Sequence, residues 1–240
     1  MVVGFLGGLF GLGGGLFLIP LLGFIYGYDQ QHAQGTALVM IIPNTTMAIW
    51  QYMRRTKMDL RVAGSLAVAA LPFTFLGAHF ATHMASTPLR RSFAVMMLAI
   101  AIFYVWTGVR HKAAEAQRPP RSHLWPVAIP IGAVGGGLSG LFATGGAVFA
   151  VPLMATIFNF PQVVAQFMGL ALVGPGTIIN LATYALNGDV VWGAGIALAI
   201  GGTIAIGWGV HLAHYLPERV LRGFFALLAA YSAVALWLRG

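Results

Sequence analysis

Long apolar runs alternate with short polar connections along the whole chain. The runs cover residues 1–27, 33–53, 62–84, 88–109, 124–159, 163–187, 190–213 and 218–238. Most are close to the roughly 20 residues with which an α-helix crosses a bilayer, whereas a lone strand would leave its backbone polar groups unpaired in lipid. The pattern predicts an all-α, polytopic membrane protein with about eight hydrophobic segments.

Two of these runs are interrupted by glycine. As a single helix, the 36 residues of the run 124–159 would reach about 54 Å, against roughly 30 Å of hydrocarbon. Its middle holds two glycine clusters, the run 1–27 has equivalent ones, and glycine is the poorest helix former after proline. We expect each run to break near its second cluster, at 13–15 and at 145–146, into two shorter helices.

The first half of the chain is repeated 132 residues later. Gly4–Tyr52 aligns without a gap on Gly136–Tyr184, and 18 of the 49 paired positions are identical. The shared positions include glycines, prolines and polar residues, such as Gly8/Gly140, Phe10/Phe142, Gly13/Gly145, Gly14/Gly146, Pro20/Pro152, Gln34/Gln166, Pro43/Pro175, Thr45/Thr177, Tyr52/Tyr184 and, farther on, Gly77/Gly209 and His79/His211. Two copies of one helix-breaking unit predict a transporter with its site between the halves.

We divide the chain into a transmembrane repeat at 1–111, a basic cytoplasmic linker at 112–123 and a second transmembrane repeat at 124–240. If the glycine-broken helices fold back as hairpins, each repeat makes an odd number of crossings and the copies are inverted. If the breaks only bend a helix, the copies are parallel. Inversion would put ten Lys and Arg residues on the linker side and three on the other, against nine and four for the parallel arrangement, so positive charge favours inversion.

Composition removes several classes of protein. The 240 residues are 59% hydrophobic and only 8% charged, too few charges for a soluble surface. The net charge of +8 lies in short connections, where Lys and Arg set membrane orientation, so we expect no nucleic-acid partner. The absence of cysteine excludes disulfides, thiolate metal sites and haem attachment. Met1 opens directly into apolar sequence, so processing of a signal peptide is not expected.

The acidic residues point away from a cation substrate. All five lie in connections or at helix ends, namely Asp29, Asp59, Glu115, Asp189 and Glu218. Proton- and sodium-coupled carriers usually keep a carboxylate inside the membrane. A metalloenzyme or an intramembrane aspartyl protease would also need buried ligands or paired carboxylates. We therefore expect no enzyme, no metal and no cofactor, and a positively charged protein suited to an anion.

The glycine-rich breaks are the first candidate binding elements. A helix that starts inside the membrane directs unpaired N–H groups and the positive end of its dipole into the core, and both bind anions. The candidates are Gly13, Gly14 and Gly15 with Gly145, Gly146 and Ala147. Alternatively, these glycines only allow helices to pack closely.

Polar residues next to two mid-helix prolines are the second candidates. Proline kinks a helix and frees a carbonyl. The residues that could donate hydrogen bonds to an oxyanion there are Asn44, Thr45, Thr46 and Thr177. Hydrogen bonds between helices are the alternative role, and capping or interfacial roles stay open for Gln34 and Gln166.

His79 and His211 are paired by the repeat and could couple proton movement to transport, or each make one structural hydrogen bond.

The two glycine-rich motifs carry a resemblance. Residues 8–20 read GLFGLGGGLFLIP and residues 140–152 read GLFATGGAVFAVP, which resembles the duplicated signature of the TauE/SafE sulfite-exporter family. The resemblance covers nearly the whole chain. It implies a multi-pass protein of the bacterial inner membrane that moves sulfur-containing anions. The second copy departs at Ala143, Thr144 and Ala147, where Thr144 adds a hydroxyl donor.

The expected function is therefore secondary transport of a small sulfur oxyanion, such as sulfite or an organosulfonate (sulfoacetate), in the direction of export. An anion channel or a facilitator for another small anion is the alternative, and a structural membrane protein without a transported ligand is a third class. Besides lipid and the anion, a homodimer is one option for a partner. The sequence selects neither the anion, nor the direction, nor the coupling ion.

Overall fold

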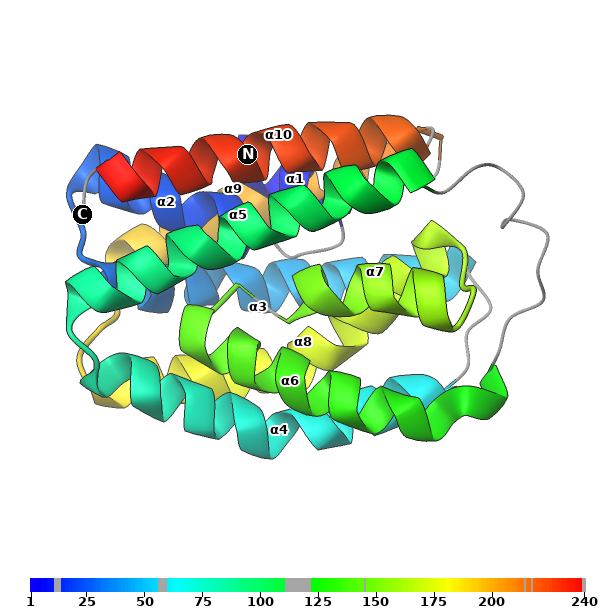
Figure 1. The fold of residues 1–240 in the computed structure, drawn as a ribbon. Coiled ribbons are helices and arrows are strands. Elements are labelled where there is room, and N and C mark those ends of the chain that lie inside the picture. The colour runs from blue at the N-terminus through cyan, green and yellow to red at the C-terminus, as the bar shows by residue number, and fades with distance from the viewer. Residues whose placement is uncertain are drawn as a thin grey trace.

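The structure, a computed structural model, describes residues 1–10, 14–55, 60–110, 122–144, 146–213, 215–216 and 218–238. Within these ranges the regular structure is helical, as predicted, and no strand occurs there. The helices are α1 (Val2–Phe10), α2 (Gly15–Tyr26), α3 (Gln30–Arg55), α4 (Leu60–His83), α5 (Ser86–Arg110), η2 (Ser122–Val127), α6 (Ala128–Phe142), α7 (Ala147–Ile157), α8 (Gln162–Leu186), α9 (Trp192–Ala213) and α10 (Glu218–Leu238) (Figure 1).

The predicted breaks are present in both repeats. Between α1 and α2, a Cβ atom built on Gly14 would lie 2.9 Å from the carbonyl oxygen of Val3. Between α6 and α7, a Cβ on Gly146 would overlap the carbonyl of Gly135. In a continuous helix, residues eleven apart are about 16 Å apart. The chain therefore folds back at each break, and α1/α2 and α6/α7 are hairpins.

The second helix of each hairpin reaches only part of the way across a membrane. The 12 residues of α2 and the 11 of α7 extend about 18 and 16 Å at 1.5 Å per residue, roughly half of the hydrocarbon thickness. Within the part of the chain that the structure describes, five segments are long and apolar enough to cross, namely Leu60–His83, Ser86–Phe103, Trp125–Phe142, Val163–Leu186 and Trp192–Leu212. The chain is thus a polytopic helical membrane protein.

The directions of the helices agree with the inverted arrangement. α3 and α8 are equivalent helices of the two repeats, and they lie against each other at the centre (Figure 1). The hydroxyl of Tyr52 near the end of α3 donates to Gln166 near the start of α8, and Tyr184 near the end of α8 donates to Gln34 near the start of α3. Only antiparallel helices can make both bonds, so the two repeats run in opposite directions.

The two repeats also exchange their first helices. α1 packs along α9 of the second repeat, and α6 packs along α4 of the first (Figure 1). These contacts are nearly backbone to backbone: a Cβ on Gly8 would overlap Ile206, and one on the equivalent Gly140 would overlap Thr74. Small residues let membrane helices approach this closely. Gly8 and Gly140 therefore serve close packing between helices.

α3 is sheltered by the other helices. It contacts α2, α8 and α9, and it carries the fully buried side chains of Gln34 and Asn44. A polar helix is tolerated at membrane depth when protein rather than lipid surrounds it. α5 and α10 pack side by side on the outside of the bundle, with apolar side chains exposed (Figure 1). The polar interior therefore lies between the repeats.

Two glycines of α4 give a matched test of the packing. A methyl group on Gly77 would overlap the carbonyl of Gly137 in α6, whereas one on Gly64 would meet nothing within 4 Å. We expect Gly77→Ala to cost about 1–3 kcal/mol through overpacking, which lowers the melting temperature by ~2–4 °C per kcal/mol. Gly64→Ala should be neutral or slightly stabilising, since alanine is the better helix former. Thermal unfolding in detergent measures both, and equal midpoints for the two variants would contradict the packing.

Candidate functional site

The two breaks meet in the middle of the bundle. A Cβ atom on Gly15, the first residue of α2, would lie 3.3 Å from the carbonyl oxygen of Ala143, which ends α6. It would also overlap the side chain of Ile41 in α3. Gly14 caps α2 with φ of 92°, a left-handed conformation that favours glycine. The sequence placed these breaks correctly, and the structure brings them together beside the α3–α8 crossing.

Two helices begin at this meeting point. In α2 the first backbone acceptor is Gly14, which takes hydrogen bonds from Phe17 and Leu18. In α7 Gly146 has the same position and takes bonds from Phe149 and Ala150. The amides that precede these donors have no carbonyl partner within their own helix. Both helix starts are buried, so their positive dipole ends lie in the interior. Positive ends of this kind favour a nearby negative group.

The structure brings two of the predicted threonines to the crossing. Thr45 and Thr177 are both 1% exposed and lie two residues after the prolines of α3 and α8. The hydroxyl of Thr177 donates to the carbonyl of Gly174 at 2.7 Å. A Cβ on Gly174 would lie 3.8 Å from Thr45, whose own hydroxyl has no hydrogen-bond partner in the described part of the chain.

Other predicted residues lie elsewhere. Asn44 is buried but faces α9, where the hydroxyl of Thr203 donates to its side-chain oxygen at 3.2 Å. Thr46 is exposed, and its hydroxyl donates to Ile42 in its own helix at 2.9 Å. Thr144 is buried directly after the end of α6. Gly146 caps the start of α7 and is also pressed against Gly135 of α6, so the packing role considered for it is present.

The remaining predicted residues lie outside the described part of the chain or away from this site. Gly13, Gly145 and residues 112–121 of the linker lie outside the described residues. His79 and His211 are exposed near the ends of α4 and α9. The ring of His79 lies 4.3 Å from that of His83, and the ring of His211 lies 5.0 Å from that of Tyr215. The two histidines are thus on the outer surface rather than beside the breaks.

Two crosswise hydrogen bonds join the central helices. Tyr52 donates to Gln166 Oε1 at 2.8 Å, and Tyr184 donates to Gln34 Oε1. Gln166 Nε2 also donates to the carbonyl of Leu9 at the end of α1, at 3.4 Å. All four side chains lie nine residues from the proline of their helix, so the bonds flank the crossing at equal distances. The sequence repeat pairs Gln34 with Gln166 and Tyr52 with Tyr184 as equivalent residues. Only the antiparallel contact of α3 and α8 shows that each tyrosine bonds the glutamine of the other repeat.

Ser139 and Asn180 form a polar contact that the sequence gave no reason to expect. Asn180 Nδ2 donates to the carbonyl of Ser139 at 3.0 Å, and both side chains are buried. The equivalent residues in the first repeat are Gly7 and Ala48, so the repeat marks neither position. This contact lies where α6 ends and the chain turns into α7.

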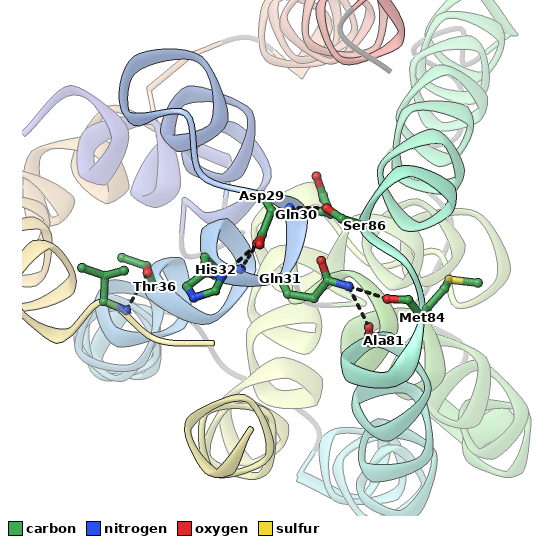
Figure 2. A network of polar contacts seen from close by, with 9 residues as sticks. Asp29, Gln30, Gln31, His32, Thr36, Ala81, Met84 and Ser86 are labelled. Carbon is green, nitrogen blue, oxygen red and sulfur yellow. Dashed lines mark hydrogen bonds and ion pairs between the residues drawn. The ribbon is translucent and has the colours of Figure 1, made fainter. Parts of the chain in front are cut away.

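A polar network holds the start of α3, the helix that carries Gln34 (Figure 2). The backbone N–H of Gln30 donates to the Ser86 hydroxyl at 2.9 Å, and Gln31 Nε2 donates to the carbonyl of Met84 at 2.6 Å. The hydroxyl of Thr36 accepts from the backbone N–H of Val191 at 3.0 Å. The turn between α4 and α5 and the connection before α9 therefore position the first turns of α3.

The charged groups of this end lie outside the membrane-spanning segments. His32 Nδ1 and Asp29 Oδ1 are 2.9 Å apart and half exposed (Figure 2). Burial raises the pKa of Asp189 in the α8–α9 connection, a protonated His32 lowers it, and the Asp29 carboxylate raises it further. Among the described side chains, the buried polar ones are Gln, Asn, Thr and Ser, and none is acidic. The interior site is therefore uncharged.

Comparisons with known proteins agree with this architecture. The family model described as Sulfite exporter TauE/SafE matches residues 1–236. The probable membrane transporter protein MJ0441 of Methanocaldococcus jannaschii is 26% identical over 189 residues, 76% of this chain and 68% of that protein. The probable membrane transporter protein YunE of Bacillus subtilis is 26% identical over 84% of this chain and 81% of its own length, and YfcA of Escherichia coli K12, also a probable membrane transporter protein, is 22% identical over 98% and 86%. No solved structure matches the chain.

The crosswise bonds predict equal sensitivity at two distant positions. Tyr52→Phe and Tyr184→Phe each leave a buried glutamine oxygen without its donor, which should cost about 0.5–2 kcal/mol. The double variant should lose the sum, because the bonds are far apart and share no partner. Tyr231→Phe, at a side chain that is 72% exposed, is the control. Thermal unfolding measures all four proteins, and a Tyr52 variant as stable as the control would contradict its role as an interhelical tie.

Proposed function

The chain belongs to the TauE/SafE sulfite-exporter family, and we propose that it is a secondary carrier that moves a small sulfur oxyanion, such as sulfite or an organosulfonate (sulfoacetate). The observation that carries the proposal is the meeting of two inverted hairpins between α3 and α8, with the starts of α2 and α7 buried at that point. Discontinuous helices whose N-terminal ends face an anionic group at the midplane are a recurrent solution in transporters.

The chemistry of the interior supports an anion. The two helix starts supply backbone N–H groups and positive dipole ends, and Thr45 supplies a buried hydroxyl without a partner among the described residues, whereas the Thr177 hydroxyl is engaged by Gly174. Among the described buried side chains there is no carboxylate that would repel a negative solute. A cation in this environment would have amide and hydroxyl oxygens but no opposite charge. The balance therefore favours a small anion.

The symmetry supports a carrier rather than a channel. Because the repeats are inverted, a rocking motion that opens one end has an equivalent that opens the other. The Tyr52–Gln166 and Tyr184–Gln34 bonds lie on opposite sides of the crossing, and both are formed here. We infer that each bond closes one end of the path and that transport requires them to open in turn. A channel would need both open together.

Sidedness and driving force follow from charge. The connections 54–61 and 110–123 hold eight of the thirteen Lys and Arg residues, which supports the cytoplasmic side of a bacterial inner membrane for these connections. Export of an anion from a negative interior is favourable by about 2.3 kcal/mol per charge per 100 mV. No coupling ion is then required. Proton coupling through His79 and His211 stays a proposal, which a pH gradient tests.

Flux into liposomes tests the proposal. Purified protein is reconstituted and offered sulfite, sulfate, thiosulfate and sulfoacetate, under an imposed membrane potential and then under a pH gradient. We expect saturable flux of at least one sulfur oxyanion that follows the potential. Flux equal to that of protein-free liposomes would exclude transport of these anions, and flux that does not saturate would favour the channel.

A single hydroxyl tests the central position. Thr45→Val keeps the shape of a buried side chain but removes the unpartnered hydroxyl at the crossing. We expect sulfite flux to fall about 10-fold or more, as for the loss of one hydrogen bond to a charged group, with little change in thermal stability. Thr82→Val is the control, because the Thr82 hydroxyl bonds within its own helix at the end of α4. A structural protein without a ligand predicts a change of stability alone.

A further inference from the structure

Three buried polar atoms near the end of α6 have no hydrogen-bond partner in the described part of the chain. They are Gln34 Nε2, Ser139 Oγ and Asn180 Oδ1, on side chains that are at most 1% exposed. Buried polar atoms are almost always paired in native proteins, and an unpaired one costs about 1–3 kcal/mol. Three such atoms in one region indicate that something polar occupies the space between them.

Two hydrogen bonds connect the three residues through α8. Asn180 donates to the carbonyl of Ser139 at 3.0 Å, which joins α8 to the last turn of α6. Tyr184 lies one helical turn beyond Asn180 on the same face of α8, and it donates to Gln34 of α3. Asn180 and Tyr184 thus lie on one stripe of α8, which contacts Ser139 of α6 and Gln34 of α3. The buried start of α7 follows α6 directly.

The existing hydrogen bonds determine which donor and acceptor atoms remain free for a ligand. The amide nitrogen of Asn180 must face the Ser139 carbonyl, because the Asn180 oxygen in that place would oppose a second acceptor. The Asn180 Oδ1 atom therefore points away from Ser139 and is free to accept a hydrogen bond. The oxygen of Gln34 is engaged by Tyr184, which leaves its nitrogen as a donor. The unpartnered Ser139 hydroxyl is available as a second donor. The region therefore offers two donors and one acceptor.

The first repeat has no equivalent of this set. Gly7 and Ala48 stand in the places of Ser139 and Asn180. Gln166, the equivalent of Gln34, uses its nitrogen on the Leu9 carbonyl. Since the first repeat forms the same hairpin and the same crossing without these polar groups, the fold does not require them. A role in recognising a ligand explains why only one half carries them.

We propose that Gln34, Ser139 and Asn180 bind an oxyanion that carries its own hydrogen-bond donor, such as hydrogensulfite or a hydroxylated sulfonate. Gln34 and Ser139 donate to the anionic oxygens, Asn180 Oδ1 accepts from the O–H of the ligand, and the start of α7 adds its positive dipole end. Sulfate has no donor at neutral pH, so its lone pairs would oppose Asn180. A site with a buried acceptor strongly rejects an analogue that lacks the donor. The inference rests on the proposed function, whose anion site it specifies.

Binding to the purified protein tests the inference without transport. Isothermal titration at mildly acidic pH compares hydrogensulfite with sulfate, and 2-hydroxyethanesulfonate with ethanesulfonate, a pair that differs by one hydroxyl. We expect the wild-type protein to bind the donor-bearing member of each pair at least about 10-fold more tightly. Asn180→Leu should remove this preference, and Ser139→Ala should weaken both members equally. Ser65→Ala, whose hydroxyl bonds within α4, is the control.

The outcomes separate the inference from the proposed function. Equal wild-type affinity for the two members of each pair would overturn the role of Asn180 while leaving anion transport intact. Retained preference in a folded Asn180→Leu protein would do the same, because another group would then recognise the hydroxyl of the ligand. If no anion binds and none is transported in liposomes, the proposed function fails as well. Since the wild-type comparison is decisive alone, misfolding of the Asn180 variant leaves the test valid.

Discussion

A helix that breaks inside a membrane must be covered by protein, because lipid cannot pair the backbone groups that the break exposes. In this protein, glycine makes that cover possible. Gly8 brings α1 against the backbone of α9, and Gly140 brings α6 against that of α4. A side chain at either place would push the hairpin away from its support. The breaks, and everything built on them, depend on this close approach.

The exchange of hairpins determines the geometry of the centre. Because each hairpin packs on a helix of the other repeat, the repeats interlock and their equivalent helices α3 and α8 cross antiparallel. The two helix starts then come to the same place from opposite directions. A symmetric scaffold of this kind has no preferred end, which suits a protein that must open to both sides of a membrane.

Departures from symmetry carry the chemical information. Asn44 faces Thr203 where the second repeat has Gly176, and Asn180 faces Ser139 where the first has Ala48 and Gly7. Symmetric residues such as Tyr52 and Tyr184 serve the frame, since both make the same bond. Polar residues present in only one repeat, such as Asn44 and Asn180, make no such symmetric bond between α3 and α8.

The sequence by itself determined the helical membrane class, the two repeats and the positions of both breaks, because apolar length, glycine clusters and an alignment of the two halves are local properties of the chain. It also predicted that Thr45 and Thr177 matter, since both follow a mid-helix proline. Only the tertiary structure decided that Thr46 faces outward, that Asn44 faces α9 and that Gln34 pairs with Tyr184 rather than with its own repeat. Which face of a helix meets which neighbour depends on packing across the whole bundle, and no local pattern encodes it.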